Sequence, residues 1–281
     1  MRFLIFSTLM LVGAGAFANE CAYQEPRNLD IDAAGLHTLE AKLGSSDLRA
    51  EGVAGLNKIE VRARACASEQ GRLAALTLDQ TRVGDTVTLS THQADQQNFS
   101  AFGSNYAYID LDVRMPQSLA LRVRSNSGDS DLKNLSSLDF SSHSGDLIVD
   151  RVDGAVVVDV HSGDVKADGI GSLDVQHSGS GDIQAENVKG DVHVGRVGSG
   201  DLTFTGVGKG VHVESVGSGD IIVRNAGGTV LVDSIGSGDV NASDVGGDLI
   251  VKSAGSGDVH HSGVKGKISV PKNDDDNDDS D

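Results

Sequence analysis

GSGDLTFTGVGKGVHVESVGSGD, residues 198–220, holds one complete repeat of this chain and the start of the next. Its tetrapeptide Gly-Ser-Gly-Asp occurs five times at an unbroken spacing of 19 residues, with aspartates at Asp182, Asp201, Asp220, Asp239 and Asp258. A fixed period of this length is typical of repeat proteins, in which each unit packs on its neighbours. The repeat therefore decides the fold class.

Apolar residues keep the same positions in each copy. After Asp201 they are Leu202, Phe204, Val207, Val211, Val213 and Val216. Pairs of apolar residues two apart predict strands with one inward face, and a Gly-rich bend at 208–210 separates two such strands. A β-sandwich does not require side chains in matching columns, whereas stacked coils do. We predict an all-β parallel β-helix, or β-solenoid, with about 19 residues per coil.

The repeat becomes less regular upstream but persists. Asp164, Asp146 and Asp129 each end a Ser-Gly-Asp, and residues 44–48, followed by the apolar pair Ile59 and Val61, match the same template. The sequence predicts a solenoid over 30–271, with irregular coils to about residue 124 and regular coils over 125–270. About 12 coils at roughly 4.8 Å each would form it.

The first 18 residues have the features of a secretory signal peptide. Arg2 precedes an apolar run over 3–12, and Ala16-Phe17-Ala18 provides a small-x-small cleavage site. We expect cleavage after Ala18 and export to the periplasm or the cell surface. The mature chain contains no apolar run long enough to span a bilayer.

The chain has two cysteines, Cys21 and Cys66. In an oxidising compartment they are expected to form a disulfide that ties an N-terminal segment, residues 19–29, onto the first coils as a cap. Two unpaired buried thiols are the alternative.

The formal net charge of −18 disfavours nucleic acids and anionic lipids as direct partners. Six of the eight residues from Asp274 to Asp281 are aspartate. We therefore predict a disordered acidic tail over 272–281.

Stacked coils place the repeat aspartates in one column, where neighbouring carboxylates about 5 Å apart repel each other by about 1 kcal/mol even in water. Each carboxylate could accept N–H groups of its own turn, or cations could bind as in calcium β-rolls with the nonapeptide Gly-Gly-x-Gly-x-Asp. The facing turns carry Asp191, Lys209, Gly228 and Gly247, not a second aspartate column, which favours turn closure and no cofactor. The calcium candidates are Asp146, Asp164, Asp182, Asp201, Asp220, Asp239 and Asp258.

Histidines also recur at coil spacing. His143 and His161 precede Ser-Gly-Asp with His177 nearby, and His193 and His212 share one outward position. Zinc or copper binding is one interpretation, and a solvent-facing stack of rings is the favoured one. We expect stacked histidines to protonate less readily than isolated ones because their charges repel.

Four of the mature chain's aromatic residues lie close together: Phe99, Phe102, Tyr106 and Tyr108. The stretch over 92–105 is long for a turn and rich in Gln, Asn and Ser, so it is interpreted as an excursion from the solenoid. Its aromatics could stack on sugars or on a protein partner, or cover a solenoid edge. Polysaccharide-active β-helices build clefts from long loops, which the regular coils lack, so no catalytic residue is predicted.

The passage from Tyr108 to Asp164 carries a family resemblance. The segment 108–113 leads to Pro116, the strand-like 119–123 follows, and the Ser-Gly-Asp coils then begin. This resembles the "putative adhesin" domain family of exported bacterial proteins, related to a head domain of auto-transporter adhesins, over roughly residues 30–270. The resemblance implies a right-handed parallel β-helix in an envelope setting, and no catalytic set.

The expected function is that of a non-enzymatic, exported binding or scaffold module of the bacterial envelope, whose partner is an envelope protein or a glycan. Three alternatives remain: a calcium-binding protein similar to β-rolls, a self-assembling envelope scaffold, and a polysaccharide-active enzyme. The oligomeric state is not assigned.

Overall fold

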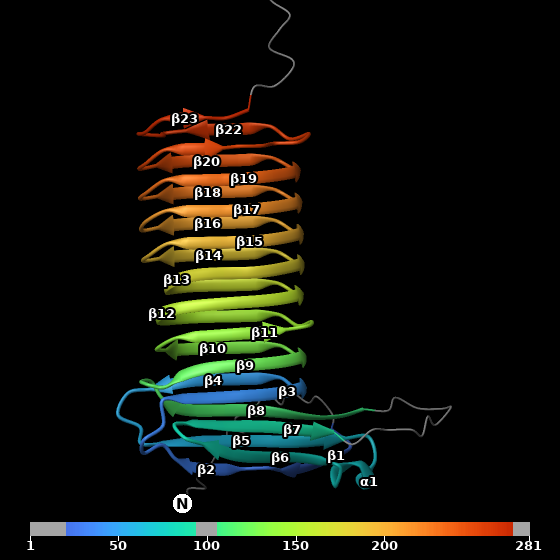
Figure 1. Cartoon of the computed structure of the whole chain (residues 1–281). Coiled ribbons are helices and arrows are strands. Elements are labelled where there is room, and N and C mark those ends of the chain that lie inside the picture. Colours follow the sequence, from blue (N-terminus) through green and yellow to red (C-terminus); the bar gives the residue numbers. More distant parts are fainter. Residues whose placement is uncertain (1–20, 94–105, 272–281) are drawn as a thin grey trace, which may run out of the picture.

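The computed structural model describes residues 21–93 and 106–271, which form an all-β solenoid (Figure 1). The predicted fold class is confirmed, with about eight turns of about 19 residues each, rather than 12. The predicted signal peptide over 1–18, Phe99, Phe102 and the predicted acidic tail over 272–281 lie outside the described residues.

The strands stack along the solenoid axis in two long rows. One row contains β3 (Thr38–Ser45), β9 (Ala120–Ser127), β11 (Leu138–Ser142), β15 (Val192–Ser199), β17 (Val211–Ser218), β19 (Val230–Ser237), β21 (Leu249–Val251) and β23 (Ile268–Ser269). The other contains β4 (Leu48–Val53), β10 (Ser130–Leu135), β14 (Ile183–Val188), β16 (Leu202–Val207), β18 (Ile221–Ala226), β20 (Val240–Val245) and β22 (Val259–Ser262). The long strands β12 (Leu147–Ser162) and β13 (Val165–Ser180) contribute to both rows.

The strands of each row pair in parallel with equivalent residues in register. In one column Ile183 pairs with Leu202, Leu202 with Ile221, Ile221 with Val240 and Val240 with Val259. The inward side chains of this column are almost completely buried up to Val240. Because full burial of such a side chain is worth about 1.5–3 kcal/mol, the columns supply the main driving force for stacking.

The N-terminal part departs from the expected parallel coils. It contains β1 (Tyr23–Pro26), β2 (Leu29–Asp32), β5 (Lys58–Ala67), β6 (Leu76–Val83), β7 (Thr86–Gln93), β8 (Ala107–Pro116) and the short helix α1 (Gln70–Leu73). Strand β5 pairs antiparallel with β1, β2 and β8, and β6 pairs antiparallel with β7. The prediction that Ile59 and Val61 form a parallel return strand was wrong, although both are fully buried. Alternating burial is the same in both kinds of sheet, so the sequence pattern could not set the strand direction.

The coil formed by β3 and β4 lies within the stack, not at its end. Strand β3 pairs with both β7 and β9, and β4 pairs with both β8 and β10. The chain therefore begins with the cap strands β1 and β2, then forms the inner coil of β3 and β4, goes back to complete the cap with β5 to β8, and continues on the other side of the inner coil at β9 (Figure 1). Within the described ranges, no helix has the length and apolar character to cross a membrane.

Candidate functional site

The repeat aspartates form a continuous hydrogen-bonded ladder. From Asp47 to Asp239, Oδ1 of each carboxylate accepts the backbone N–H of the repeat aspartate in the next coil, at 2.8–3.0 Å, and Asp258 is the last donor. Our interpretation that each carboxylate closes its own turn is corrected, because the donors belong to the neighbouring coil. The ladder explains how one carboxylate oxygen is satisfied, and calcium binding at these residues stays a prediction.

The histidines form two separate groups. The rings of His143 and His161 stack with centroids 4.9 Å apart, and His177 follows at 5.7 Å. His193 and His212 meet edge to face at 5.3 Å. Over residues 21–93 and 106–271 no three or more His, Cys, Asp or Glu side chains are arranged to hold a metal ion.

His193 differs from the expectation that stacked histidines resist protonation. Its Nδ1 lies 3.0 Å from Asp174 Oδ1 and its Nε2 lies 3.3 Å from Glu214 Oε1. The hydrogen bond with Asp174 is the largest cause that raises the pKa of His193, and Glu214 adds to it against the effect of partial burial. At His193, the two carboxylates raise the pKa despite the neighbouring imidazole of His212.

The two described aromatics of the predicted ligand patch, Tyr106 and Tyr108, lie side by side at the start of β8. Their ring centroids are 6.0 Å apart at an interplanar angle of 38°. They border a hollow of about 560 Å³, which we call the tyrosine hollow. It is lined by Ser45, Asp47, Gln93, Tyr106, Ala107, Tyr108 and Asp110.

Three distant segments build the tyrosine hollow. Ser45 and Asp47 come from the corner between β3 and β4, Gln93 is the last residue of β7, and the tyrosines come from the chain entering β8. The clustering of the tyrosines in the sequence predicts their part of the site, whereas the polar wall has no signal in the sequence. Only the insertion of β3 and β4 between the cap and the later coils brings residues 45–47 next to residues 106–110.

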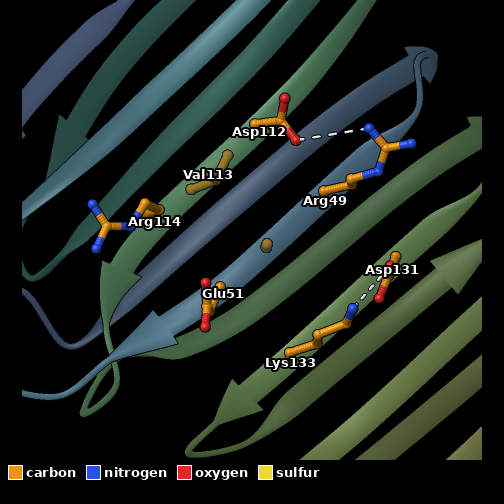
Figure 2. A pocket seen from close by; sticks show the side chains of 8 residues that line it. Arg49, Glu51, Asp112, Val113, Arg114, Asp131 and Lys133 are labelled. Carbon is orange, nitrogen blue, oxygen red and sulfur yellow. Dashed lines mark ion pairs between the residues drawn. The ribbon is translucent and has the colours of Figure 1, made fainter. Parts of the chain in front are cut away.

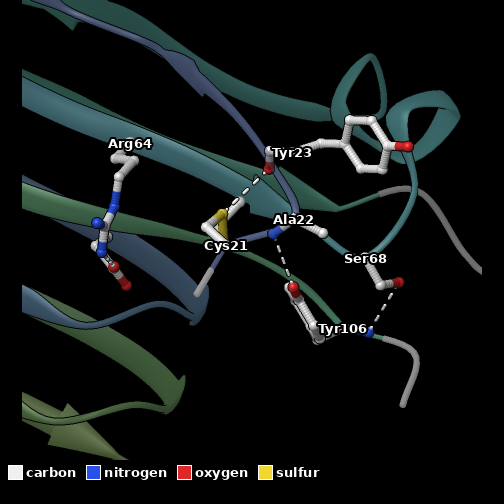
Figure 3. Close-up of a disulfide and its surroundings, with 8 residues drawn as sticks. Cys21, Ala22, Tyr23, Arg64, Ser68 and Tyr106 are labelled. Carbon is white, nitrogen blue, oxygen red and sulfur yellow. Dashed lines mark hydrogen bonds and ion pairs between the residues drawn. A yellow bond between two sulfur atoms is a disulfide. The ribbon is translucent and has the colours of Figure 1, made fainter. Parts of the chain in front are cut away.

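The disulfide and the N-terminal strand hold this region in place (Figure 3). Cys21 is joined to Cys66, and Cys66 pairs with Tyr108 in the register of β5 and β8. The backbone N–H of Ala22, next to Cys21, donates to the Tyr106 hydroxyl at 3.0 Å. The disulfide therefore ties β1 against the same strands that present the two tyrosines.

The walls of the tyrosine hollow are acidic and hydrogen-bonded. Asp110 accepts a hydrogen bond from the Arg64 guanidinium at 2.8 Å, which raises the pKa of Arg64. Partial burial, followed by the charge of Asp110, raises the pKa of the Tyr108 hydroxyl, which therefore stays protonated at neutral pH. A protonated hydroxyl beside carboxylates offers both donors and acceptors to a ligand.

A second groove, of about 300 Å³, lies across β4, β8 and β10 and carries alternating charges (Figure 2). Its charged residues pair with one another: Arg49 with Asp112 at 4.0 Å, and Lys133 with Asp131 at 3.2 Å. Arg114 pairs with Glu60 on β5 at 2.9 Å. The sequence carries no signal of this groove, since its residues meet only across strands far apart in sequence.

The fold and the hollow together define an all-β solenoid that presents a partly aromatic, acidic surface depression near its capped end. Residues 72–242 match the Toastrack DUF4097 family. This match covers more than half of the chain, so the chain belongs to the Toastrack DUF4097 family. The family resemblance expected from the sequence is thereby confirmed.

Several solved structures are similar to this chain at low sequence identity. A "putative cell adhesion protein" of Clostridium sporogenes ATCC 15579 shares 11% identity at a TM-score of 0.32, covering 88% of this chain and 100% of its own. A "putative adhesin" of Bacteroides fragilis NCTC 9343 shares 12% identity at a TM-score of 0.36, and the match covers 88% of this chain and 96% of the adhesin. A "putative lipid binding protein" of Parabacteroides distasonis ATCC 8503 shares 13% identity at a TM-score of 0.38, and the match covers 88% of this chain and 97% of that protein. No curated protein matches the chain.

Proposed function

We propose that this protein is an exported, non-enzymatic binding module of the bacterial envelope, and that the tyrosine hollow binds a glycan. The observation that carries this proposal is the convergence of two neighbouring tyrosine rings with Asp47, Asp110 and Gln93 around one hollow. Aromatic faces stack on the apolar faces of sugar rings, while carboxylate and amide groups hydrogen-bond to sugar hydroxyls. Both kinds of contact are present on the same wall.

A rigid site supports selective binding because little ordering is required when the ligand arrives. Strand β8 is paired on both sides, with β4 and β5, and the disulfide ties the outer strand β1 to β5. The solenoid then acts as a scaffold that presents the hollow. The disulfide also supports export, since such bonds persist in oxidising compartments.

Glycan-array screening of the full protein, followed by calorimetric titration of the sugars retained, tests the proposal. We expect Tyr108→Ala to weaken binding by about tenfold or more, because loss of an aromatic stacking surface costs on the order of 1.4 kcal/mol. Gln93→Ala at the rim should weaken it less. Tyr23→Ala is the matched control, since Tyr23 is an exposed tyrosine of the same region outside the hollow.

Three results would contradict the proposal. Binding that survives both hollow substitutions would move the site elsewhere, and release of shortened sugars would support the polysaccharide-active alternative. Recovery of the protein from the cytoplasm with Met1 intact would reject export, which instead predicts a mature chain beginning at Asn19. Melting curves of Tyr108→Ala and Gln93→Ala establish that both variants are folded.

A further inference from the structure

The outward face at the start of β8 groups the two tyrosines of the tyrosine hollow with a carboxylate. Tyr106, Tyr108 and Asp110 follow one another at two-residue spacing, and the residues between them, Ala107 and Ile109, are buried. Because side chains alternate between the two faces of a strand, the rings and the carboxylate lie on one surface. A ligand that contacts the aromatic faces therefore lies next to Asp110.

A second carboxylate lies beside Asp110 on the neighbouring strand. Leu48 pairs with Leu111 in the parallel register of β4 and β8, and the backbone N–H of Leu111 donates to the carbonyl oxygen of Asp47 at 2.9 Å. Asp47 and Asp110 are therefore about one strand spacing apart. Both line the tyrosine hollow, and within the described parts of the chain no lysine, arginine or histidine lines it.

The two carboxylates are unequally balanced by positive charge. Arg64 donates to Asp110 at 2.8 Å from the side of β5. In the described part of the chain, Asp47 forms no ion pair with a basic side chain, and its Oδ1 accepts the backbone N–H of Asp129 at 3.0 Å. Asp129 continues the aspartate ladder, so more negative charge adjoins the hollow and attracts cations. A cationic group of a ligand would supply the partner that Asp47 lacks.

The tyrosine rings add a second means of recognising a cation, since the face of an aromatic ring attracts ammonium groups. The rings of Tyr106 and Tyr108 lie 6.0 Å apart at an interplanar angle of 38°, close enough for one ligand to contact both. Partial burial is the largest cause that raises the pKa of the Tyr108 hydroxyl, and the charge of Asp110 follows, opposed by Arg64. Asp47 raises this pKa further, so both carboxylates act on the ring.

We propose that the tyrosine hollow selects glycans whose sugars carry free, protonated amino groups. This selectivity rests on the proposed glycan-binding function and specifies the class of sugar. An amino sugar can stack its apolar face on a tyrosine ring and direct its ammonium group to Asp47 and Asp110, where hydrogen bonds are charge-assisted. An N-acetylated sugar lacks that charge, and an acidic sugar is repelled by the two carboxylates.

Calorimetric titration of the full protein with three matched oligosaccharides tests the proposal. The β-1,4-linked oligomers of glucosamine, N-acetylglucosamine and glucose share one backbone and differ only in the group on carbon 2. At about pH 6, where aliphatic amines are protonated, the glucosamine oligomer should bind at least about tenfold more tightly than the other two, as expected for one hydrogen bond to a charged group. This preference should shrink in high salt, because salt screens the charge contact.

Asp47→Asn isolates the charge, since asparagine retains an oxygen that can accept the N–H of Asp129. The preference for the glucosamine oligomer over the glucose oligomer should fall by about tenfold in this variant. Asp182→Asn is the matched control, because Asp182 accepts the N–H of Asp201 at 2.9 Å in the same ladder and lies outside the hollow. It should leave the preference unchanged.

Three results would overturn the proposal. Equal affinity for the three oligomers would leave the hollow as a site for neutral glycans, so the proposed function would survive without this selectivity. Failure of the glucosamine oligomer to bind would reject amino sugars, and the glycan array then decides the proposed function separately. Equal losses in Asp47→Asn and Asp182→Asn would show that amino sugars adsorb along the aspartate ladder and not in the hollow. Melting curves establish that both variants are folded.

Discussion

At the scale of single residues, the corner between coils explains why the repeat contains glycine directly before aspartate. The corner glycines have positive φ values, such as +136° at Gly200, a conformation that L residues rarely adopt. A Cβ added to Gly200 would overlap the carbonyl oxygen of Gly181 in the preceding coil. Both the backbone conformation and the close stacking of coils therefore require glycine here.

The first prediction concerns this corner. Gly200→Ala should lower the free energy of unfolding by about 2–4 kcal/mol, from backbone strain and overlap with the neighbouring coil. Thermal melting followed by circular dichroism measures the effect. Gly44→Ala is the control, because a Cβ at Gly44 meets no atom within 4 Å, and it should change stability little. Equal melting temperatures for the two variants would contradict the stacking argument.

The second prediction concerns the aspartate ladder. Asp220 accepts the partly buried N–H of Asp239 at 2.8 Å. Asp220→Asn retains an acceptor oxygen and removes repulsion with neighbouring carboxylates, so it should match or exceed the native stability. Asp220→Ala leaves the N–H unpaired and should cost about 1 kcal/mol. Melting the native protein and both variants with and without calcium distinguishes the ladder from a cation site. If calcium stabilised the native protein and this stabilisation were lost in Asp220→Asn, the result would favour a cation site.

At the scale of strands, the sequence predicts the columns well and the pairing direction poorly. Val194, Val213 and Val232 occupy one inward column, as their 19-residue spacing requires. Ile59 shows the same alternation but belongs to an antiparallel strand, since alternation reports which face is buried and not which strand lies beside it. Only the tyrosines of the tyrosine hollow could be predicted from the sequence. Ser45 lies near Tyr108 because the coil of β3 and β4 stacks next to β8, and the sequence pattern does not report that stacking order.

The third prediction concerns His193, a polar side chain on the outer face of β15. Its pKa is raised in the folded protein by Asp174 and Glu214. The stabilisation it contributes is therefore fully present below the unfolded pKa of about 6.5 and is lost as pH rises through the higher folded pKa. We expect His193→Gln to lower the melting temperature at about pH 5.5 and to have little effect at about pH 8.5.

NMR titration of the His193 ring checks the cause directly. In Asp174→Asn, the midpoint of the titration should fall relative to the native protein, because the strongest stabilising partner of the charged imidazole is removed. An unchanged midpoint would assign the shift to another group. The two measurements together separate the effect of the carboxylates from that of the adjoining His212 ring.

At the scale of the whole molecule, the stack is nearly one-dimensional, and each coil depends on the coils above and below it. In such proteins stability is close to a sum of coil terms and interface terms, so the ends open most easily. The two ends are not equivalent here. The N-terminal end has antiparallel strands on its outer side and a disulfide that spans 45 residues, whereas β22 and β23 have a pairing strand on one side only among residues 21–93 and 106–271.

The last prediction follows from this asymmetry. Hydrogen exchange measured on dilute protein should show a gradient along the stack. The amides of β21 to β23 should exchange first and those of β14 to β18 last. The inner columns explain the order, because Ile221 and Val223 are fully buried while Ile268 is half exposed. Reducing the disulfide should speed exchange in β1 and β5 and leave β22 unchanged, which serves as an internal control. Uniform exchange along the stack would instead mean that the solenoid opens in one cooperative step, and that its two ends do not differ in stability.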